Sequence, residues 1–418
     1  MKRYEKYKPT GIQWLPEIPE HWNIMQLRKY LSLVSIKGKG DKQLLSVTRE
    51  NGVIERDTYN LEENHNFVPE DLNGYKYVTP GQFVINKMKS WQGSYGVSDY
   101  EGIVSPAYFV CDLNFPNKEY FSQAIRSRAY VDFFAQWSKG IRVGQWDLEP
   151  IALKSIPFFE PPIPEQNKIV AYLDKRITLI ENCKCQRERE LQTLNELKQA
   201  EIASLVTRGL NPDVPMKDSG IPWIGQIPDH WELRRFKTVC SLIREPSKNG
   251  DKKIALENIE TNTGRLIATD SVFDGEGVHF EPGDILFGKL RPYLAKVYLA
   301  KESAQAVGDF YVFRSNGSII PAYLHKLIIS APFIGVVNAG TYGTKMPRAS
   351  WQDISQLNIP LPPIEEQNAI VEYIESKTNK IDTMVEALKA EIDRLTEYKQ
   401  RLISDVVTGQ IDVRGEQI

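Results

Sequence analysis

The chain contains two similar twelve-residue stretches, Gly11-Ile-Gln-Trp-Leu-Pro-Glu-Ile-Pro-Glu-His-Trp22 and Gly220-Ile-Pro-Trp-Ile-Gly-Gln-Ile-Pro-Asp-His-Trp231, at an offset of 209 residues. Two further pairs of segments repeat in the same order, each at an offset of 201 residues. They are Pro161-Pro-Ile-Pro-Glu-Gln-Asn167 with Pro362-Pro-Ile-Glu-Glu-Gln-Asn368, and Lys198-Gln199 with Lys399-Gln400. A repeat unit of about 200 residues is far longer than a solenoid repeat. The sequence therefore predicts two domains of one kind, each followed by one long helix.

The regions between these anchors are less alike but still comparable. Residues 25–155 are called here the first copy, and residues 234–355 the second copy. Both alternate short apolar runs with turns rich in Gly, Pro, Asn and Asp, which is typical of short strands. We expect strands at residues 44–47, 83–85, 254–256 and 284–287, and helical stretches at 119–137 and 322–336. This pattern predicts an α+β fold in which each copy has a mixed or antiparallel sheet and few helices.

Two segments without Pro or Gly, residues 165–208 and 365–408, follow the clusters of proline. Proline is tolerated at a helix start, and Gly209 and Gly409 supply the expected stops. Each predicted helix would have about 44 residues and a length of about 65 Å. A helix of that length outside a core needs a partner helix.

The second of these segments carries a heptad pattern. Its 4-3 alternation comprises Ile374, Thr378, Ile381, Val385, Leu388, Ile392, Leu395, Lys399, Leu402 and Val406. The first segment has a weaker seam, formed by Leu173, Ile177, Ile180, Leu191, Leu194 and Leu205, with Lys184 and Arg187 at core positions. Heptads of this kind indicate a coiled coil, and we expect an antiparallel pair within the chain. Helices that each pack on their own domain, or a dimer formed through the helices, are the alternatives.

Two basic segments in each copy are candidates for contact with DNA. After the strand that follows a Pro-Gly turn, the first copy has Lys87, Lys89 and Trp91, and the second has Lys289, Arg291 and Tyr293. Alternate residues at a strand end share a face, and Arg suits phosphate oxygens or a guanine edge. A second basic loop recurs as Lys139 with Arg142 and as Lys345 with Arg348, near Trp146 and Trp351 respectively. Any one of these side chains could instead be an ordinary solvated charge.

Composition limits the function further. The net charge of −2 is not that of a general polyanion binder, so a nucleic-acid surface must be a local patch. No apolar stretch approaches the roughly 20 residues that cross a bilayer, and no secretory signal is recognisable, so we expect a cytoplasmic protein. The four cysteines have no metal-ligand spacing and are expected to be reduced thiols.

The sequence contains none of the common catalytic motifs. The sequence has no phosphate-binding GxxxxGK[ST] loop, no dinucleotide fingerprint, no GxSxG or HExxH, and no Asn-Pro-Pro-aromatic tetrapeptide. His21 and His230 occupy matching places, and we expect them to be packing residues beside Trp rather than catalytic groups. The sequence thus predicts no catalytic residue and no metal site.

The organisation resembles the specificity subunit of type I restriction–modification enzymes. The resemblance is carried by the Ile-Pro-x-His-Trp segments at 18–22 and 227–231, the Pro-Pro-Ile-x-Glu-Gln segments at 161–166 and 362–367, and Pro282-Gly-Asp-Ile-Leu-Phe-Gly-Lys-Leu-Arg291. It covers essentially the whole chain. The first copy departs from the pattern, with Gln82 in place of Asp284 and Lys89 in place of Arg291, which weakens the case for DNA contact by its strand motif.

The resemblance implies a division into four regions. They are a first target-recognition domain (1–155), a first long-helix region (156–210), a second target-recognition domain (211–355) and a second long-helix region (356–418). Each domain would read one half of a split DNA sequence, and the helices would fix the unread gap. Methyltransferase (modification) subunits that use S-adenosylmethionine, and restriction subunits that use ATP and magnesium, would be the partners. The chain itself would hold none of these cofactors.

Two other functions remain open at this stage. A coiled-coil scaffold without DNA specificity would also contain paired helices, and it would bind no DNA. A fused restriction–methylation enzyme, or a lone nuclease, would need an active-site motif of its own.

Overall fold

The computed structural model describes residues 2–56, 69, 71–140, 146–246, 252–269, 275–343 and 346–416. The chain divides into unit 1, comprising Met1–Arg187 and Glu391–Ile418, and unit 2, comprising Glu188–Ala390. Two long helices, α4 (Ile163–Arg208) and α9 (Ile364–Val407), run through both units. Each unit therefore contains one copy together with part of each long helix.

The first copy and its surroundings are built mainly from short strands. The strands are β1 (Tyr7–Ile12), β2 (Leu15–Pro19), β3 (Asn23–Gln26), β4 (Leu31–Val34), β5 (Leu45–Thr48), β6 (Gly52–Glu55), β7 (Lys76–Val78), β8 (Phe83–Ile85), β9 (Tyr95–Val97), β10 (Gly102–Val104), β11 (Phe109–Leu113), β12 (Ser138–Lys139), β13 (Asp147–Leu148) and β14 (Pro157–Glu160). The helices are α1 (Lys118–Ile125), α2 (Arg128–Trp137) and α3 (Pro150–Ser155), with 3₁₀ turns at Leu27–Lys29 and Ser90–Gln92.

The second copy is built in the same way. Its strands are β15 (Met216–Asp218), β16 (Gln226–Pro228), β17 (Glu232–Arg235), β18 (Cys240–Ile243), β19 (Lys253–Ile254), β20 (Val278–Phe280), β21 (Ile285–Gly288), β22 (Val297–Leu299), β23 (Ala304–Ala306), β24 (Phe310–Ser315) and β25 (Asn358–Leu361). Its helices are α5 (Phe236–Val239), α6 (Pro321–Ile329), α7 (Ala331–Ala339) and α8 (Trp351–Gln356), with 3₁₀ turns at Leu256–Asn258 and Pro292–Leu294.

The sequence repeat is also a structural repeat. A four-stranded antiparallel sheet has the order β4-β11-β8-β9 in unit 1 and β18-β24-β21-β22 in unit 2. The registers correspond, because Ile85 pairs with Phe109 in the first sheet and Phe287 with Tyr311 in the second. Each copy is also joined at its base, where β3 pairs with β14 and β17 pairs with β25.

The copies differ in the strands beside this common sheet. Unit 2 has a three-stranded sheet, β19-β23-β20, in which β19 and β23 run parallel. At the corresponding place, unit 1 has the antiparallel pairs β5–β6 and β10–β7. The expected α+β class with mixed sheets is confirmed.

Two details of the expected elements were wrong. The strand expected at 254–256 ends at Ile254, and a 3₁₀ turn begins at Leu256. The helical stretches expected at 119–137 and 322–336 are each divided in two. Ser127 and Ser330 lie at the breaks, where extended backbone interrupts the helix and starts a new one.

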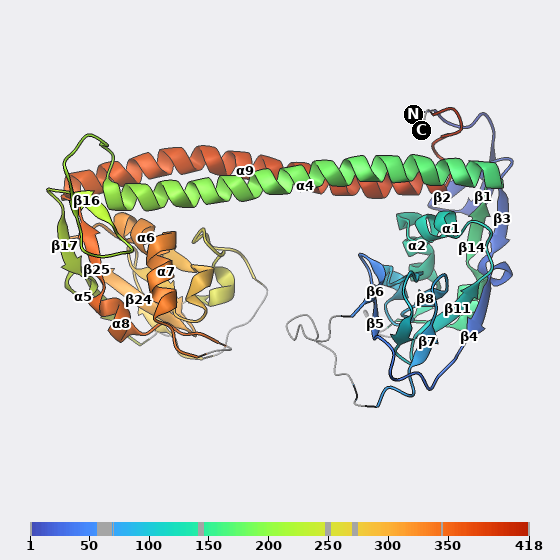
Figure 1. The fold of residues 1–418 in the computed structure, drawn as a ribbon, viewed down its shortest axis with the longest axis horizontal. Coiled ribbons are helices and arrows are strands. Elements are labelled where there is room, and N and C mark those ends of the chain that lie inside the picture. The colour runs from blue at the N-terminus through green and yellow to red at the C-terminus, as the bar shows by residue number, and fades with distance from the viewer. Residues whose placement is uncertain are drawn as a thin grey trace. The chain divides into compact units, whose positions relative to one another are not determined.

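The long helices pair antiparallel, as the heptads predict. In unit 1, Lys399 of α9 binds Glu181 of α4 at 2.7 Å. In unit 2, Lys198 of α4 binds Asp382 of α9 at 2.6 Å, and these four residues are repeat mates at the offset of 201. Figure 1 shows α4 and α9 side by side. Every residue of the heptad seam in α9 is buried or partly buried. Arg187, a charged core position in α4, pairs with Glu391 at 3.0 Å.

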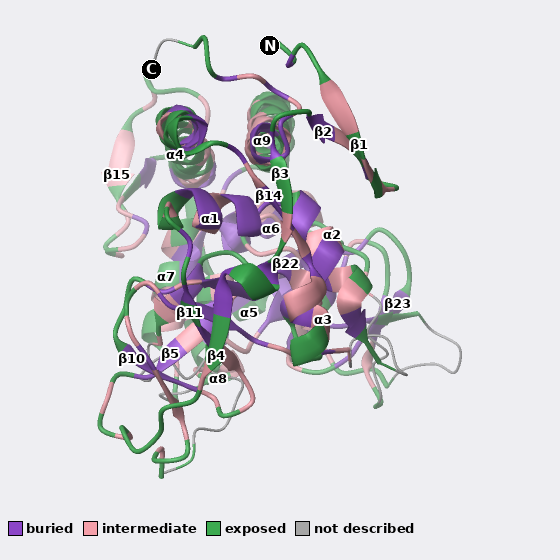
Figure 2. Cartoon of the chain, turned by 90° about the vertical axis from the view of Figure 1, so that its right-hand side faces the viewer, coloured by how far each residue is buried: buried purple, intermediate pink, exposed green. Residues whose placement is uncertain are grey.

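Each copy also packs on helix ends. The core of unit 1 contains Ile169 and Leu173 near the start of α4 and Val406 and Val407 at the end of α9. The core of unit 2 correspondingly contains Val206 of α4 together with the start of α9. Buried residues of α1 and α2, which belong to the first core, are the purple parts of these helices in the cartoon of Figure 2. The long helices therefore pack on each other and also on the two copies. Both arrangements were considered from the sequence, the first as an antiparallel pair and the second as helices that pack on their own domain.

The two stop glycines are confirmed. Gly209 and Gly409 follow the helix ends with φ of 75° and 73°, a left-handed conformation that suits glycine. A Cβ atom on Gly209 would lie 2.9 Å from Glu366 Oε1 and 3.1 Å from the ring of Trp231. Glycine therefore lets each helix end turn directly beneath the tryptophan of the repeated motif.

No single described helix has the length and apolarity to cross a bilayer, although α6 and α7 would meet those criteria taken together as a bent pair. These two helices meet at 62°, and most of their apolar side chains lie in the core of unit 2. Packing inside this unit accounts for their apolar character.

Candidate nucleic-acid interface

The repeated sequence motifs meet in both units. In unit 1, the indole of Trp22 donates to Glu165 Oε1 at 3.0 Å, and His21 Nε2 lies 2.8 Å from Glu165 Oε2. In unit 2, Trp231 and His230 bind Glu366 at 3.0 and 2.8 Å. Each motif thus joins the start of a copy to the start of the helix that follows it, and each histidine shares one Glu side chain with the tryptophan beside it in sequence.

Unit 1 adds one contact to this arrangement. The hydroxyl of Tyr4 donates to Glu165, and burial followed by this hydrogen bond raises the pKa of Tyr4 well above its ordinary value. Residues near the C-terminus close over the same place, where Arg414 lies 4.8 Å above the Tyr4 ring. These contacts hold the two ends of the described chain within one unit.

The first copy has Gln82 where the second has Asp284, and a second difference between the copies compensates for this one. Asp284 accepts two hydrogen bonds of 2.7 Å from the guanidinium of Arg314, and this interaction raises the pKa of Arg314. In the first copy, the amide of Gln82 donates to Asp112, which corresponds to Arg314, at 2.7 Å. Both side chains also accept a backbone N–H three residues earlier, at 2.9 Å. At this position each copy therefore has its own pair of residues, Gln82 with Asp112 and Asp284 with Arg314.

We predict that Arg314→Asp lowers the free energy of unfolding by about 3 kcal/mol, because it leaves a buried carboxylate beside a second negative charge. Asp284 is only 2% exposed, so water cannot screen it. Adding Asp284→Gln recreates the pair of the first copy and should restore most of the loss. Chemical denaturation of the four proteins of this double-mutant cycle measures the coupling. Equal losses with and without Asp284→Gln would show that the two positions are independent.

The basic segments predicted for the first copy lie together. The Lys87 ammonium binds Asp147 at 2.8 Å, and the carbonyl of Lys87 accepts from Leu148 N at 3.1 Å. Trp91 packs on Trp146 with ring centroids 5.1 Å apart. Lys89 and Lys139 are exposed. Arg142 lies outside the described residues.

The second copy brings its two segments together in the same way. The carboxylate of Asp309 binds Lys289 at 3.5 Å and Arg348 at 3.0 Å. Leu290 and Arg348 form a β-bridge, and Arg291 N donates to the carbonyl of Pro347 at 2.8 Å. Lys345 lies outside the described residues.

Arg291 has an unusual backbone conformation. Its φ of 50° and ψ of 60° are left-handed, a region that non-glycine residues seldom occupy. Such strain concentrates at functional sites, where the surrounding structure maintains it. The turn that it makes is followed by Tyr293, whose side chain is 48% exposed. This turn therefore presents an aromatic ring to solvent beside the basic residues.

The two acidic residues that join these segments, Asp147 and Asp309, were not predicted from the sequence. Asp309 corresponds to Ala107 in the first copy, and Asp147 corresponds to Arg348 in the second. Neither acidic residue is therefore repeated between the copies. The carboxylate of Asp147 binds Lys87, and that of Asp309 binds Lys289. In each copy the second basic segment thereby lies next to the first. A clustered set of cations and aromatic rings on a rigid sheet can contact phosphates and base edges.

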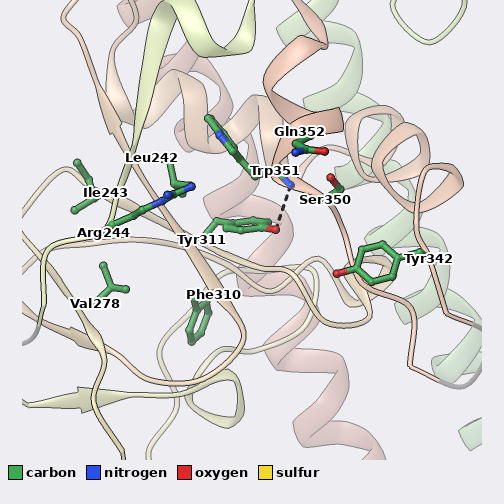
Figure 3. A pocket seen from close by; sticks show the side chains of 10 residues that line it. All are labelled: Leu242, Ile243, Arg244, Val278, Phe310, Tyr311, Tyr342, Ser350, Trp351 and Gln352. Atoms are coloured by element: carbon green, nitrogen blue, oxygen red, sulfur yellow. Dashed lines mark hydrogen bonds between the residues drawn. The ribbon is translucent and has the colours of Figure 1, made fainter.

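A pocket of about 380 Å³ adjoins this cluster in unit 2. Figure 3 shows Arg244 beside Tyr311, with Trp351 and Gln352 on a second side of the pocket and Tyr342 on a third. The Lys289 ammonium lies 5.6 Å from the centre of the Tyr311 ring, so the cluster and the pocket are continuous. Within the described ranges, no group of three or more His, Cys, Asp or Glu side chains could hold a metal ion.

Comparison with known proteins agrees with this geometry. Residues 228–394 match the family model described as "Type I restriction modification DNA specificity domain". The putative type I restriction enzyme MjaX specificity subunit of Methanocaldococcus jannaschii is 24% identical, over 98% of this chain and 97% of the relative. The MjaVIII specificity subunit of the same organism is 23% identical, over 95% of both chains.

One solved structure has the same fold. It comes from a study titled as the structural basis of complex assembly and conformational transition of the type I R-M system. It is 15% identical with a TM-score of 0.65, and the likeness covers 94% of this chain and 99% of that chain. Two copies of one α+β domain with a shared antiparallel helix pair define a class of internally duplicated proteins. In sequence and fold, the chain is similar to specificity subunits of type I restriction–modification enzymes.

Proposed function

We propose that the chain reads a bipartite DNA sequence, one half with each copy. The observation that carries the proposal is that two basic segments meet in both copies, after the ends of the equivalent strands β8 and β21. Lys87 with Trp91 in the first copy, and Lys289 with Tyr293 in the second, occupy equivalent places. Contacts with phosphates would position each copy, and contacts with base edges would select the sequence.

The paired helices would set the gap between the two halves. Half-sites read from one face of B-DNA have centres about one turn apart, roughly 34 Å. An α-helix of 44 residues, the length of α9, is about 66 Å long, so the pair has ample length for that separation. The ion pairs between α4 and α9 hold the helices in one register, which favours a fixed gap.

We further propose that the chemistry belongs to partners. Modification subunits that bind S-adenosylmethionine would methylate adenine, and restriction subunits that use ATP and magnesium would cleave. The chain would contribute specificity without a catalytic residue or cofactor. If it were instead a fused enzyme, the purified chain alone, given DNA, S-adenosylmethionine, ATP and magnesium, would transfer methyl groups or cleave. A scaffold without DNA specificity would show no salt-dependent DNA binding even with a modification subunit present.

Replacing Lys289 and Arg291 by alanine together should weaken DNA binding by the complex with modification subunits. Two lost phosphate contacts would reduce the slope of log K against log salt by about 2 and the affinity at least about tenfold. Titrations at several salt concentrations measure both quantities. Lys389→Ala, on the exposed surface of α9, is the matched control. Wild-type affinity and slope in the double variant would remove these residues from the interface.

A further inference from the structure

We propose that the pocket of unit 2 reads bases of the second half-site, with Arg244 and Gln352 as its specificity-determining residues. The aromatic pocket is defined here by Arg244, Tyr311, Tyr342, Trp351 and Gln352. The inference rests on the proposed function and adds to it the residues that select the sequence.

The aromatic pocket is continuous with the basic cluster through the backbone as well as through Lys289. Tyr342 N donates to Arg348 O at 3.2 Å, and Arg348 N donates to Tyr342 O at 3.0 Å. Arg348 in turn binds Asp309, which also holds Lys289. A duplex whose phosphates engage these cations therefore brings its base edges or sugars next to the pocket.

The base of the pocket is held rigidly. The hydroxyl of Tyr311 donates to Ala349 O and accepts from Trp351 N, both at 3.1 Å. Trp351 is further packed against Phe313, with ring centroids 5.4 Å apart. Side chains fixed in this way can discriminate between ligands because little reorganisation accompanies binding.

The rim offers groups suited to reading bases. The side chains of Arg244 and Gln352 are exposed, and neither makes a hydrogen bond to another residue in the described part of the chain. Arginine pairs bidentately with guanine, and glutamine with adenine. Tyr342 is 62% exposed, an unusual exposure for a large ring, and it can stack on a base or pack against a thymine methyl group.

The described part of the first copy has different side chains at the positions that correspond to this pocket. Arg244, the residue after β18, corresponds to Ser35, the residue after β4 in the first copy. Tyr311 corresponds to Phe109, which has the same place in the register of the sheet. Helix α3 of the first copy begins at Pro150, which corresponds to Trp351 at the start of α8 in the second copy. If the two copies read different sequences on one scaffold, the discrimination must come from side chains that differ at equivalent places beside the shared basic surface. Arg244, Tyr311 and Trp351 meet that requirement.

The test is made in the assembled complex with modification subunits, by mapping methylated adenines in a DNA library. Gln352→Ala and Arg244→Ala are each expected to relax the preference at one position of the second half by roughly ten- to hundredfold. The first half and the gap should stay unchanged. Asp353→Ala, the exposed neighbour on α8, is the matched control and should leave both halves as they were.

Each other outcome has a distinct meaning. Unchanged preferences at both halves in both variants would overturn the inference while leaving the bipartite function standing. Failure of the variants to assemble with the modification subunit, measured by size-exclusion chromatography, would make the pocket a protein-docking surface and would also overturn it. A wild-type complex without any bipartite target would instead refute the proposed function.

Discussion

With three extra heptads in each long helix, the chain is expected to direct methylation by the modification subunits to a target whose unread gap is about nine base pairs longer. The change duplicates residues 179–199 of α4 and residues 381–401 of α9, which face each other. Three heptads add about 32 Å to the helix pair. This increment is close to one turn of B-DNA, roughly 34 Å, so both copies would again meet nearly the same face of the duplex.

The duplicated segments retain their pairing partners. They contain the ion pairs Glu181–Lys399, Arg187–Glu391 and Lys198–Asp382. The heptad seam is also continued without a phase shift, because whole heptads are inserted. The lengthened chain should therefore fold, and its thermal unfolding can be compared with that of the wild type.

Mapping of methylated adenines measures the gap directly. Duplicating residues 179–199 in α4 alone is the control, since it leaves one helix without a partner and should abolish assembly instead of lengthening the gap. A wild-type gap in the doubly extended chain would mean that the helices do not set the spacing.

The architecture could be predicted from the sequence where the signal was local and repeated. The Ile-Pro-x-His-Trp segments and the heptads of α9 identified two copies and a helix pair, because the first pattern occurs once in each half of the chain and the second repeats every seven residues. Helix ends were predicted within one or two residues, since proline precedes each start and Gly209 or Gly409 follows each end. The breaks at Ser127 and Ser330 were missed, because a serine within an apolar periodic stretch is compatible with one continuous helix.

The candidate site was only partly predictable. The two basic segments were found by their repetition, but their meeting through Asp147 and Asp309 depends on contacts between segments far apart in sequence. The aromatic pocket likewise gathers residues from β24, α8 and the end of β18. A comparison of equivalent positions in the two copies would have revealed one further feature. The pair Gln82 and Asp112 in the first copy corresponds to the pair Asp284 and Arg314 in the second.

Exchange of the first copy tests the central claim most directly. Residues 25–155 are replaced by the corresponding residues of a specificity subunit with a different target, and methylated adenines are mapped in cells that also contain the modification subunits. Since each copy has its own sheet, core and basic surface, one half of the target should switch completely to that of the donor. The other half and the gap should remain those of the parent. A target in which both halves change, or in which neither does, would contradict the account.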